Sequence, residues 1–198
     1  MIDNILFFDT ETTGVAPDTL HPVYDVDRYP HICQLSWTFN DMDKDFIIRP
    51  DGWTIPPETT AIHGISTEMA LSKGVPFHDA LKLFCIDLLD ADIICAHNAQ
   101  FDKRMLIADA TRLTNQERGL NFEKLIKSKT CIDTMMLTID FVGAVFTKGA
   151  KKGLPGKFPR LEELYYKLFQ SSFPAHNSME DVRALRKCYY ELITRNII

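Results

Sequence analysis

Residues 5–14 read Ile5-Leu6-Phe7-Phe8-Asp9-Thr10-Glu11-Thr12-Thr13-Gly14, an apolar run that ends in two acids. The apolar and aromatic start of this run predicts a buried β-strand. Because side chains alternate along a strand, Asp9 and Glu11 project from the same face. Two carboxylates crowded at the end of a buried strand repel each other and lose hydration unless a cation compensates them. The pattern indicates either a strand that presents two metal ligands or acids in an ordinary turn.

The residues around these acids favour a ligand site over a turn. A glycine at position 14 lets the backbone approach a ligand closely, and the hydroxyls of Thr12 and Thr13 can donate hydrogen bonds to a phosphate or sugar. A third acid, Asp102, ends the sequence HNAQFD at residues 97–102. It falls in the first turn of a predicted helix, where complementing the helix dipole is the alternative role.

A fourth acid follows a histidine near the carboxyl end of the chain. Asp181 lies five residues after His176, at the start of a predicted helix. Ser178 with Asp181, and Asn177 with Glu180, are both patterns of helix capping, so the acid alone has a structural explanation. Capping does not require a histidine at the mouth of the helix, which makes His176 a candidate functional residue.

Hydrophobic periodicity along the rest of the chain predicts an α/β domain. Strands are predicted at Ile5–Phe8, Ile32–Phe39, Phe46–Ile48 and Ile93–Ala96, with a turn at residues 40–43 and a fifth strand located only vaguely near Thr130–Ile132. Helical spacing begins near residue 77 with Leu81, Phe84, Leu88 and Leu89, and recurs at residues 100–113, 116–126, 133–142, 160–169 and 179–195. Strands followed by strand-helix units imply a mixed sheet flanked by helices.

The composition predicts a single globular domain over residues 1–198. Hydrophobic residues make up 45% and charged residues 25%, which excludes disordered, collagenous and low-complexity chains. No apolar run approaches the roughly 18 residues of a membrane span, and the amino terminus does not resemble a secretion signal. Five widely spaced cysteines without a CxxC predict reduced core thiols rather than disulfides or a zinc site. We therefore expect a cytoplasmic protein with no membrane contact.

Charge is distributed unevenly along the chain. The net charge of −5 argues against a protein that coats nucleic acid through bulk electrostatics. Residues 1–51 carry ten acidic and three basic side chains, whereas residues 124–160 carry eight basic and two acidic ones. Five of these cations, three glycines and two prolines lie in residues 147–160, which predicts a mobile basic loop. This loop is either a solvated surface segment or a contact for a phosphate backbone.

Taken together, these segments resemble the DnaQ-like (DEDDh) 3′-to-5′ exonuclease family of the ribonuclease H-like superfamily. The resemblance covers nearly the whole chain, from Ile5 to about Leu192. It rests on five segments that follow the family's order and spacing: FDTETTG at residues 8–14, IHGI at 62–65, HNAQFD at 97–102, Ile132-Asp133-Thr134, and His176 with Asp181. Departures are the long stretch of residues 15–29, Gln34 in place of the family's frequent Glu, and Ser178 in place of Ala. None of these lies at a catalytic position implied by the resemblance.

The resemblance implies a fold and a reaction. The fold is ribonuclease H-like, an α/β domain whose five-stranded mixed sheet has helices on both sides. The reaction is hydrolysis of phosphodiester bonds by two divalent cations, Mg²⁺ or Mn²⁺, the ions that hard oxygen ligands select. Asp9, Glu11, Asp102 and Asp181 would hold these ions, and His176 would act as the general base.

The resemblance also implies how the substrate binds. Glu58 and His63 would contact the terminal nucleotide, the backbone of Thr13 and Gly14 would hold its sugar and phosphate, and Thr10 completes the implied substrate-binding set. We expect the partner to be the 3′ end of single-stranded or frayed nucleic acid, DNA rather than RNA, although the side chains that would read a 2′-hydroxyl cannot be placed from sequence. Association with a polymerase through a carboxy-terminal extension is not supported, because the chain ends just after its last predicted helix.

Two other functions remain open at this stage. A catalytically silent nucleic-acid-binding module would have lost an acid or the histidine, and all five are present. A metal-dependent phosphohydrolase of small nucleotides would use the same acids, and only the basic loop of residues 147–160 favours a polymer. The sequence does not separate proofreading from repair or turnover.

Overall fold

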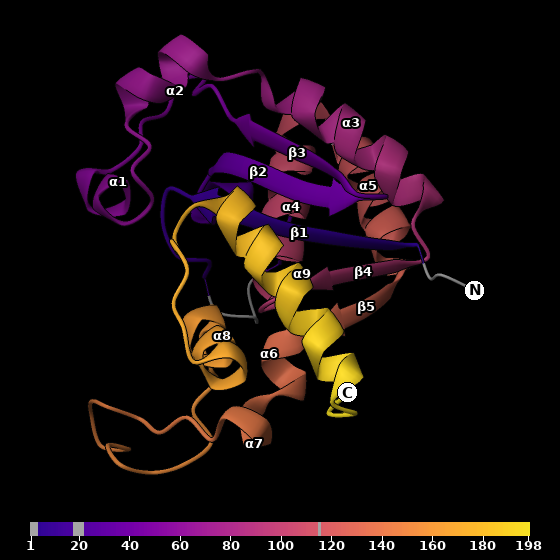
Figure 1. The fold of residues 1–198 in the computed structure, drawn as a ribbon. Helices are drawn as coiled ribbons and strands as arrows, with labels where there is room; N and C mark the ends of the chain where they lie inside the picture. The colour runs from indigo at the N-terminus through magenta and orange to yellow at the C-terminus, as the bar shows by residue number, and fades with distance from the viewer. Residues whose placement is uncertain (1–3, 18–21, 115) are drawn as a thin grey trace.

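A five-stranded mixed sheet forms the centre of the computed structural model, which describes residues 4–17, 22–114 and 116–198. The strand order is β3-β2-β1-β4-β5 (Figure 1). β1 is antiparallel to β2, and β2 to β3, whereas β4 is parallel to both β1 and β5. The bounds are Ile5–Thr12 for β1, Ile32–Phe39 for β2, Met42–Ile47 for β3, Ile93–Ala96 for β4 and Thr130–Asp133 for β5. The predicted α/β fold and mixed sheet are confirmed.

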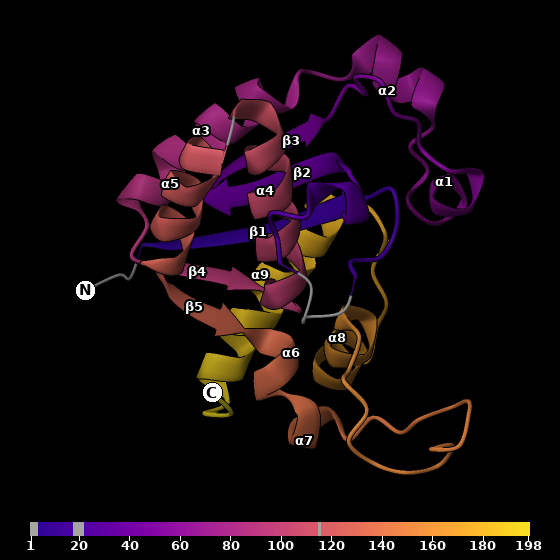
Figure 2. The same cartoon turned by 180° about the vertical axis from the view of Figure 1, so that it is seen from behind.

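Helices cover both faces of this sheet. α8 and α9 lie on one face, and α3, α4 and α5 lie on the other (Figures 1 and 2). None of the helices within the described ranges is long and apolar enough to cross a bilayer. The helices are α1 (Pro57–His63), α2 (Thr67–Lys73), α3 (Phe77–Asp90), α4 (Ala99–Thr114), α5 (Gln116–Lys127), α6 (Thr134–Leu137), α7 (Ile139–Val142), α8 (Leu161–Phe169) and α9 (Ser178–Thr194), with a 3₁₀ turn at Val26–Arg28.

Alternation along β1 separates two hydrophobic cores. Phe7 packs in the core formed with α8 and α9, whereas Leu6 and Phe8 pack in the core formed with α3, α4 and α5. Because side chains two positions apart share a face, Asp9 and Glu11 continue the Phe7 row toward α9. The strand therefore carries its acids on the same side as one of its buried aromatic residues.

Two predicted elements differ from the structure. The turn after β2 contains only Asn40 and Asp41, both with positive φ, so β3 begins at Met42 rather than Phe46. Asn and Asp tolerate this conformation, and a two-residue turn of this kind matches the twist of a hairpin. The helix expected at residues 133–142 is divided at Thr138, whose hydroxyl donates to the Thr134 carbonyl oxygen and whose backbone departs from helical geometry.

Other differences concern the helices and the thiols. α1 and α2 were not predicted, because each is only seven residues long. Leu89, which the sequence places in the helical spacing of α3, is exposed. The cysteines are free thiols as expected, but Cys131 is exposed because β5 is an edge strand.

Candidate active site

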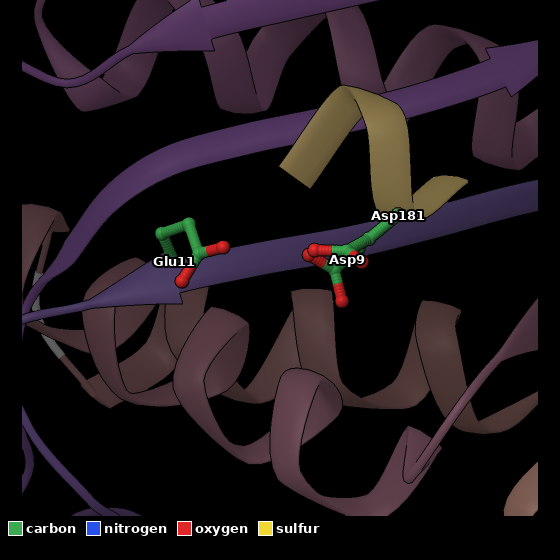
Figure 3. Close-up of side chains that lie close together, drawn as sticks. All are labelled: Asp9, Glu11 and Asp181. Carbon is green, nitrogen blue, oxygen red and sulfur yellow. The ribbon is translucent and has the colours of Figure 1, made fainter. Parts of the chain in front are cut away.

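Three carboxylates meet on the α9 side of the sheet. Asp9 and Glu11 come from β1, and Asp181 comes from the first turn of α9 (Figure 3). Each side chain offers an oxygen that lies within 4.8 Å of those offered by the other two. The structure thus brings together acids that are about 170 residues apart in sequence, a separation that neither local motif could bridge by itself.

Contacts between α9 and the sheet set this geometry. The Ser178 hydroxyl donates to the Asp9 carbonyl oxygen at 2.8 Å, and the Ser178 amide donates to Gln34 Oε1 at 3.3 Å. The helix is capped by Asn177, whose side chain accepts from the Glu180 amide, so Ser178 is not the capping residue. Ser178, which departs from the family pattern, therefore fastens the start of α9 to the two central strands.

An irregularity in β1 adjoins the acids. The antiparallel pairing with β2 shifts register between Glu11, which faces Gln34, and Thr12, which faces Ile32. Such a bulge bends the strand and redirects side chains, and bulges are frequent beside active sites. The bulge ends the regular strand where the carboxylates are presented.

Asp102, in the first turn of α4, lies outside the group of three carboxylates and contacts β1 through Thr10. Its side chain is only 2% exposed, and its Oδ1 accepts hydrogen bonds from the Thr10 amide at 3.0 Å and the Thr10 hydroxyl at 2.7 Å. Thr10 points to the α4 side of β1, as alternation requires. In this structure the buried Thr10 hydroxyl therefore holds an acid, whereas the resemblance implied contact with substrate.

Burial and mutual repulsion make these acids hard to ionise. Burial raises the pKa of Asp9 well above its ordinary value, and the charges of Asp102, Asp181 and Glu11 raise it further. Burial, with the charges of Asp181 and Asp102, raises the pKa of Glu11 to about 8. Burial also raises the pKa of Asp102 and of Asp181 to about 7, against the lowering effect of their hydrogen bonds from Thr10 and from the His176 amide. A divalent cation bound to these acids would favour their ionised forms.

His176 reaches the cluster through its backbone. Its amide donates to Asp181 Oδ2 at 3.0 Å, and its φ of 69° is unusual for a residue with a side chain. The imidazole is 53% exposed, and its Nε2 lies 3.5 Å from Glu162 Oε1 in the first turn of α8. The structure therefore places the ring beside Glu162 rather than among the three carboxylates.

The Thr13-Gly14 segment is fixed by hydrogen bonds. The Thr13 amide donates to the His31 carbonyl oxygen and the Thr13 hydroxyl accepts from the His31 amide, both at 2.9 Å. The Thr12 hydroxyl donates to the Gly14 carbonyl oxygen at 2.6 Å. A Cβ added at Gly14 would meet, among the described residues, only Pro30 Cβ at an ordinary 3.7 Å. The packing of these residues does not require glycine at this position.

His63 and Glu58 occupy different environments on α1. His63 is buried, with its Nδ1 accepting from the Ile65 amide at 3.1 Å and its Nε2 lying 3.6 Å from Cys33 Sγ. Burial lowers its pKa, and a hydrogen bond with the Thr12 backbone acts in the opposite direction. Glu58 is exposed in the first turn and lies outside the carboxylate cluster. Of these two, the structure places only His63 against β1.

The sequence of the chain matches a known family over most of its length. A profile named RNase T and described as an exonuclease matches residues 6–189. The chain belongs to this exonuclease family. Membership implies hydrolysis of phosphodiester bonds with divalent metal ions. No curated protein matches the sequence.

Solved exonuclease structures share the fold. E. coli Exonuclease I with a dA16 oligonucleotide is similar over 98% of this chain and 42% of that chain, with a TM-score of 0.68 and 20% identity. A zinc-bound form of the E. coli enzyme with single-stranded DNA gives a TM-score of 0.70 at 20% identity, covering 98% of this chain and 41% of that one. Exonuclease I from Methylocaldum szegediense gives 0.67 at 17% identity, with 98% and 41% covered. The chain spans less than half of the length of these exonucleases.

Several supporting residues of this exonuclease domain were not found from sequence. Glu162 is an ordinary acid in the first turn of α8, so nothing in the local sequence indicates that it lies beside His176. His97 Nδ1 lies 2.9 Å from Thr134 Oγ1, and its Nε2 lies 2.9 Å from the Pro159 carbonyl oxygen. His97 thereby ties the end of β4 to the base of the loop at residues 147–160.

That loop is partly ordered by its own backbone. Val145 bridges Pro155, and the Phe146 and Gly153 amides donate to the carbonyl oxygens of Leu154 and Phe146 at 3.1 and 2.7 Å. Lys148, Lys151 and Lys152 are exposed near its tip, whereas Lys157 Nζ binds both Glu163 carboxylate oxygens. Four of the five predicted loop cations, Lys148, Lys151, Lys152 and Arg160, are thus exposed, and the fifth, Lys157, supports the start of α8.

Proposed function

We propose that residues 1–198 form a single DEDDh-type exonuclease domain that removes nucleoside 5′-monophosphates from the 3′ end of single-stranded or frayed nucleic acid. The observation that carries this proposal is the convergence of Asp9, Glu11 and Asp181, with Asp102 behind them, in a member of an exonuclease family. The oligonucleotides bound to E. coli Exonuclease I favour single-stranded DNA over RNA as the substrate.

The donor set fits two hard divalent cations. Four carboxylates provide only oxygen ligands, which Mg²⁺ and Mn²⁺ prefer. Burial first, and then the charges of the neighbouring acids, raise the pKa values of Asp9 and Glu11, and a cation would compensate both their lost hydration and their charge. Bound ions would lower the pKa of a water molecule and neutralise charge on the scissile phosphate. Asp9, Glu11 and Asp181 would contribute directly, with Asp102 oriented for the site by Thr10.

His176 is the proposed general base. It would accept the proton of the attacking water at an imidazole nitrogen, and its exposed ring leaves room for a substrate to approach. Glu162 lies on the side of the ring from which it would hold the imidazole in place. The hydrogen bond from the His176 amide to Asp181 couples the position of this residue to the acids.

The substrate end would lie against the segment after β1. Because the packing of the described residues does not require glycine at position 14, an explanation for Gly14 is close approach of a sugar or phosphate to the backbone. Thr13 would hold the same nucleotide, and His63, which is packed against β1, would support it from α1. Glu58 would contact the nucleotide only from the exposed start of α1.

The test is a time course with single-stranded DNA carrying a 5′ label. With Mg²⁺, products should shorten stepwise from the 3′ end, and a circular single strand should remain intact. Asp9→Asn should abolish hydrolysis while keeping a cooperative thermal transition, and Asp90→Asn, an exposed acid of α3, should leave the rate unchanged. Cleavage of the circle, or wild-type activity in Asp9→Asn, would contradict the proposal.

A further inference from the structure

A separate cavity of about 450 Å³ opens between the start of β2, the segment after β3, the start of α3 and the end of α4. None of the four acids is among its lining residues. Ile32, Ile48 and Phe77 are buried and give it an apolar floor. Its volume and its mixed apolar and polar lining are typical of small-molecule sites.

One wall of this cavity is a stacked pair of aromatic rings. The His31 imidazole and the Trp53 indole lie parallel, with their centroids 4.6 Å apart and only 2° between their planes. The His31 ring is partly exposed, and its Nδ1 lies 3.5 Å from Asp109 Oδ1. Nucleobases stack on aromatic side chains of this kind without requiring a particular base.

Polar contacts of Asp109 and Arg112 hold the His31 side of this wall. Asp109, on α4, accepts a hydrogen bond from the Ile32 amide at 2.7 Å and pairs with Arg112. The same arginine also donates to the carbonyl oxygens of Val26, Tyr29 and Pro30. His31 is therefore fixed by its neighbours before any ligand arrives, which reduces the entropy lost on binding.

Arg49 provides a positive charge at the rim of the cavity. The Arg49 side chain is exposed and lines the cavity, and its backbone amide is fixed by a hydrogen bond to the Val75 carbonyl oxygen at 2.8 Å. A guanidinium binds phosphate oxygens in a forked geometry, and that interaction is stronger than a neutral hydrogen bond. Asp51, also exposed on the rim, offers an acceptor for an amino group.

We infer that this cavity binds a nucleotide, with its base against the His31–Trp53 wall and its phosphate at Arg49. The choice of a nucleotide rests on the proposed function. The His31 carbonyl oxygen also accepts from the Thr13 amide and the His31 amide donates to the Thr13 hydroxyl, so the cavity adjoins the segment proposed to hold the substrate end. A released mononucleotide and a residue of the bound strand share this chemistry.

Tryptophan fluorescence gives a direct measurement. The chain has two tryptophans, and Trp37 is fully buried with its indole nitrogen donating to Asp87, so Trp53 is the residue that a ligand can reach. Titration is carried out with EDTA, to prevent hydrolysis, using dAMP in one arm and a short oligo(dA) in the other. Saturable quenching by dAMP identifies a mononucleotide site, and quenching by oligo(dA) alone identifies a site for the strand. The absence of saturable quenching in both arms overturns the inference.

Variants of the lining residues test whether the fluorescence quenching comes from binding in the cavity. Arg49→Ala, an exposed change with little risk to folding, should weaken binding measured by calorimetry by roughly tenfold, the usual effect of losing one charge-assisted hydrogen bond. Trp53→Phe should remove the quenching, and Lys82→Ala, an exposed cation of α3 outside the cavity, should change neither. Unchanged affinity in Arg49→Ala would also overturn the inference. Asp9→Asn should lose hydrolysis but retain quenching, which separates failure of this site from failure of the proposed exonuclease activity.

Discussion

Replacing Glu11 with glutamine should stabilise the metal-free protein, and only at high pH. Burial and the charges of Asp181 and Asp102 raise the pKa of Glu11 from 4.5 to about 8 in the folded state. Since the folded state binds this proton more tightly than the unfolded state, stability falls as pH rises from about 4.5 to about 8 and stays reduced above that range. At about 1.36 kcal/mol per pKa unit, the ionised carboxylate costs the folded state on the order of 4–5 kcal/mol.

Thermal unfolding in EDTA at several pH values between 5 and 9 measures this effect. Glu11→Gln keeps the shape of the side chain but carries no charge, so its unfolding temperature should exceed that of the wild type by roughly 10 °C at pH 9 and by little at pH 5, at about 2–4 °C per kcal/mol for a chain of this size. Glu68→Gln, an exposed change on α2, should show no such pH trend. A constant difference between Glu11→Gln and the wild type across this pH range would refute the reasoning.

Three further predictions concern the metal, the base and the basic loop. Mg²⁺ should raise the unfolding temperature of the wild type more at pH 8 than at pH 5, because Asp102 and Asp181, with pKa values of about 7, bind protons in competition with the cation at low pH. Equal increases in unfolding temperature at the two pH values would contradict this competition. His176→Ala should slow single-turnover hydrolysis by roughly 10²–10⁴-fold without weakening Mg²⁺ binding, and an equal loss of substrate affinity would assign His176 to binding instead. Replacing Lys148, Lys151 and Lys152 with Ala should weaken strand binding and reduce the slope of log binding constant against log salt concentration by up to roughly 2. Cleavage at saturating substrate should not change. An unaltered slope would show that the loop does not contact the strand.

Local sequence patterns determined most of the fold. The apolar run before Asp9 and the alternation of a strand placed β1 and the common face of its two acids, because those features depend on neighbouring residues only. Helical spacing located α3, α4, α5, α8 and α9 to within a few residues. The short helices α1 and α2 carry too few turns for a periodic signal, and the two-residue turn at Asn40 and Asp41 depends on backbone conformations that charge and hydropathy do not report.

Only the tertiary structure decided how the site is assembled. Ser178 reads as a helix cap in the sequence, yet its hydroxyl binds the Asp9 carbonyl oxygen 169 residues away. Nothing in the sequence around Thr10 indicates that its hydroxyl donates to Asp102, 92 residues away. The parallel rings of His31 and Trp53 have no sequence signature either. The physical reason is the same in each case: sequence spacing reports which face of an element a side chain occupies, but the partner on that face is chosen by the packing of α4, α9 and the sheet against one another.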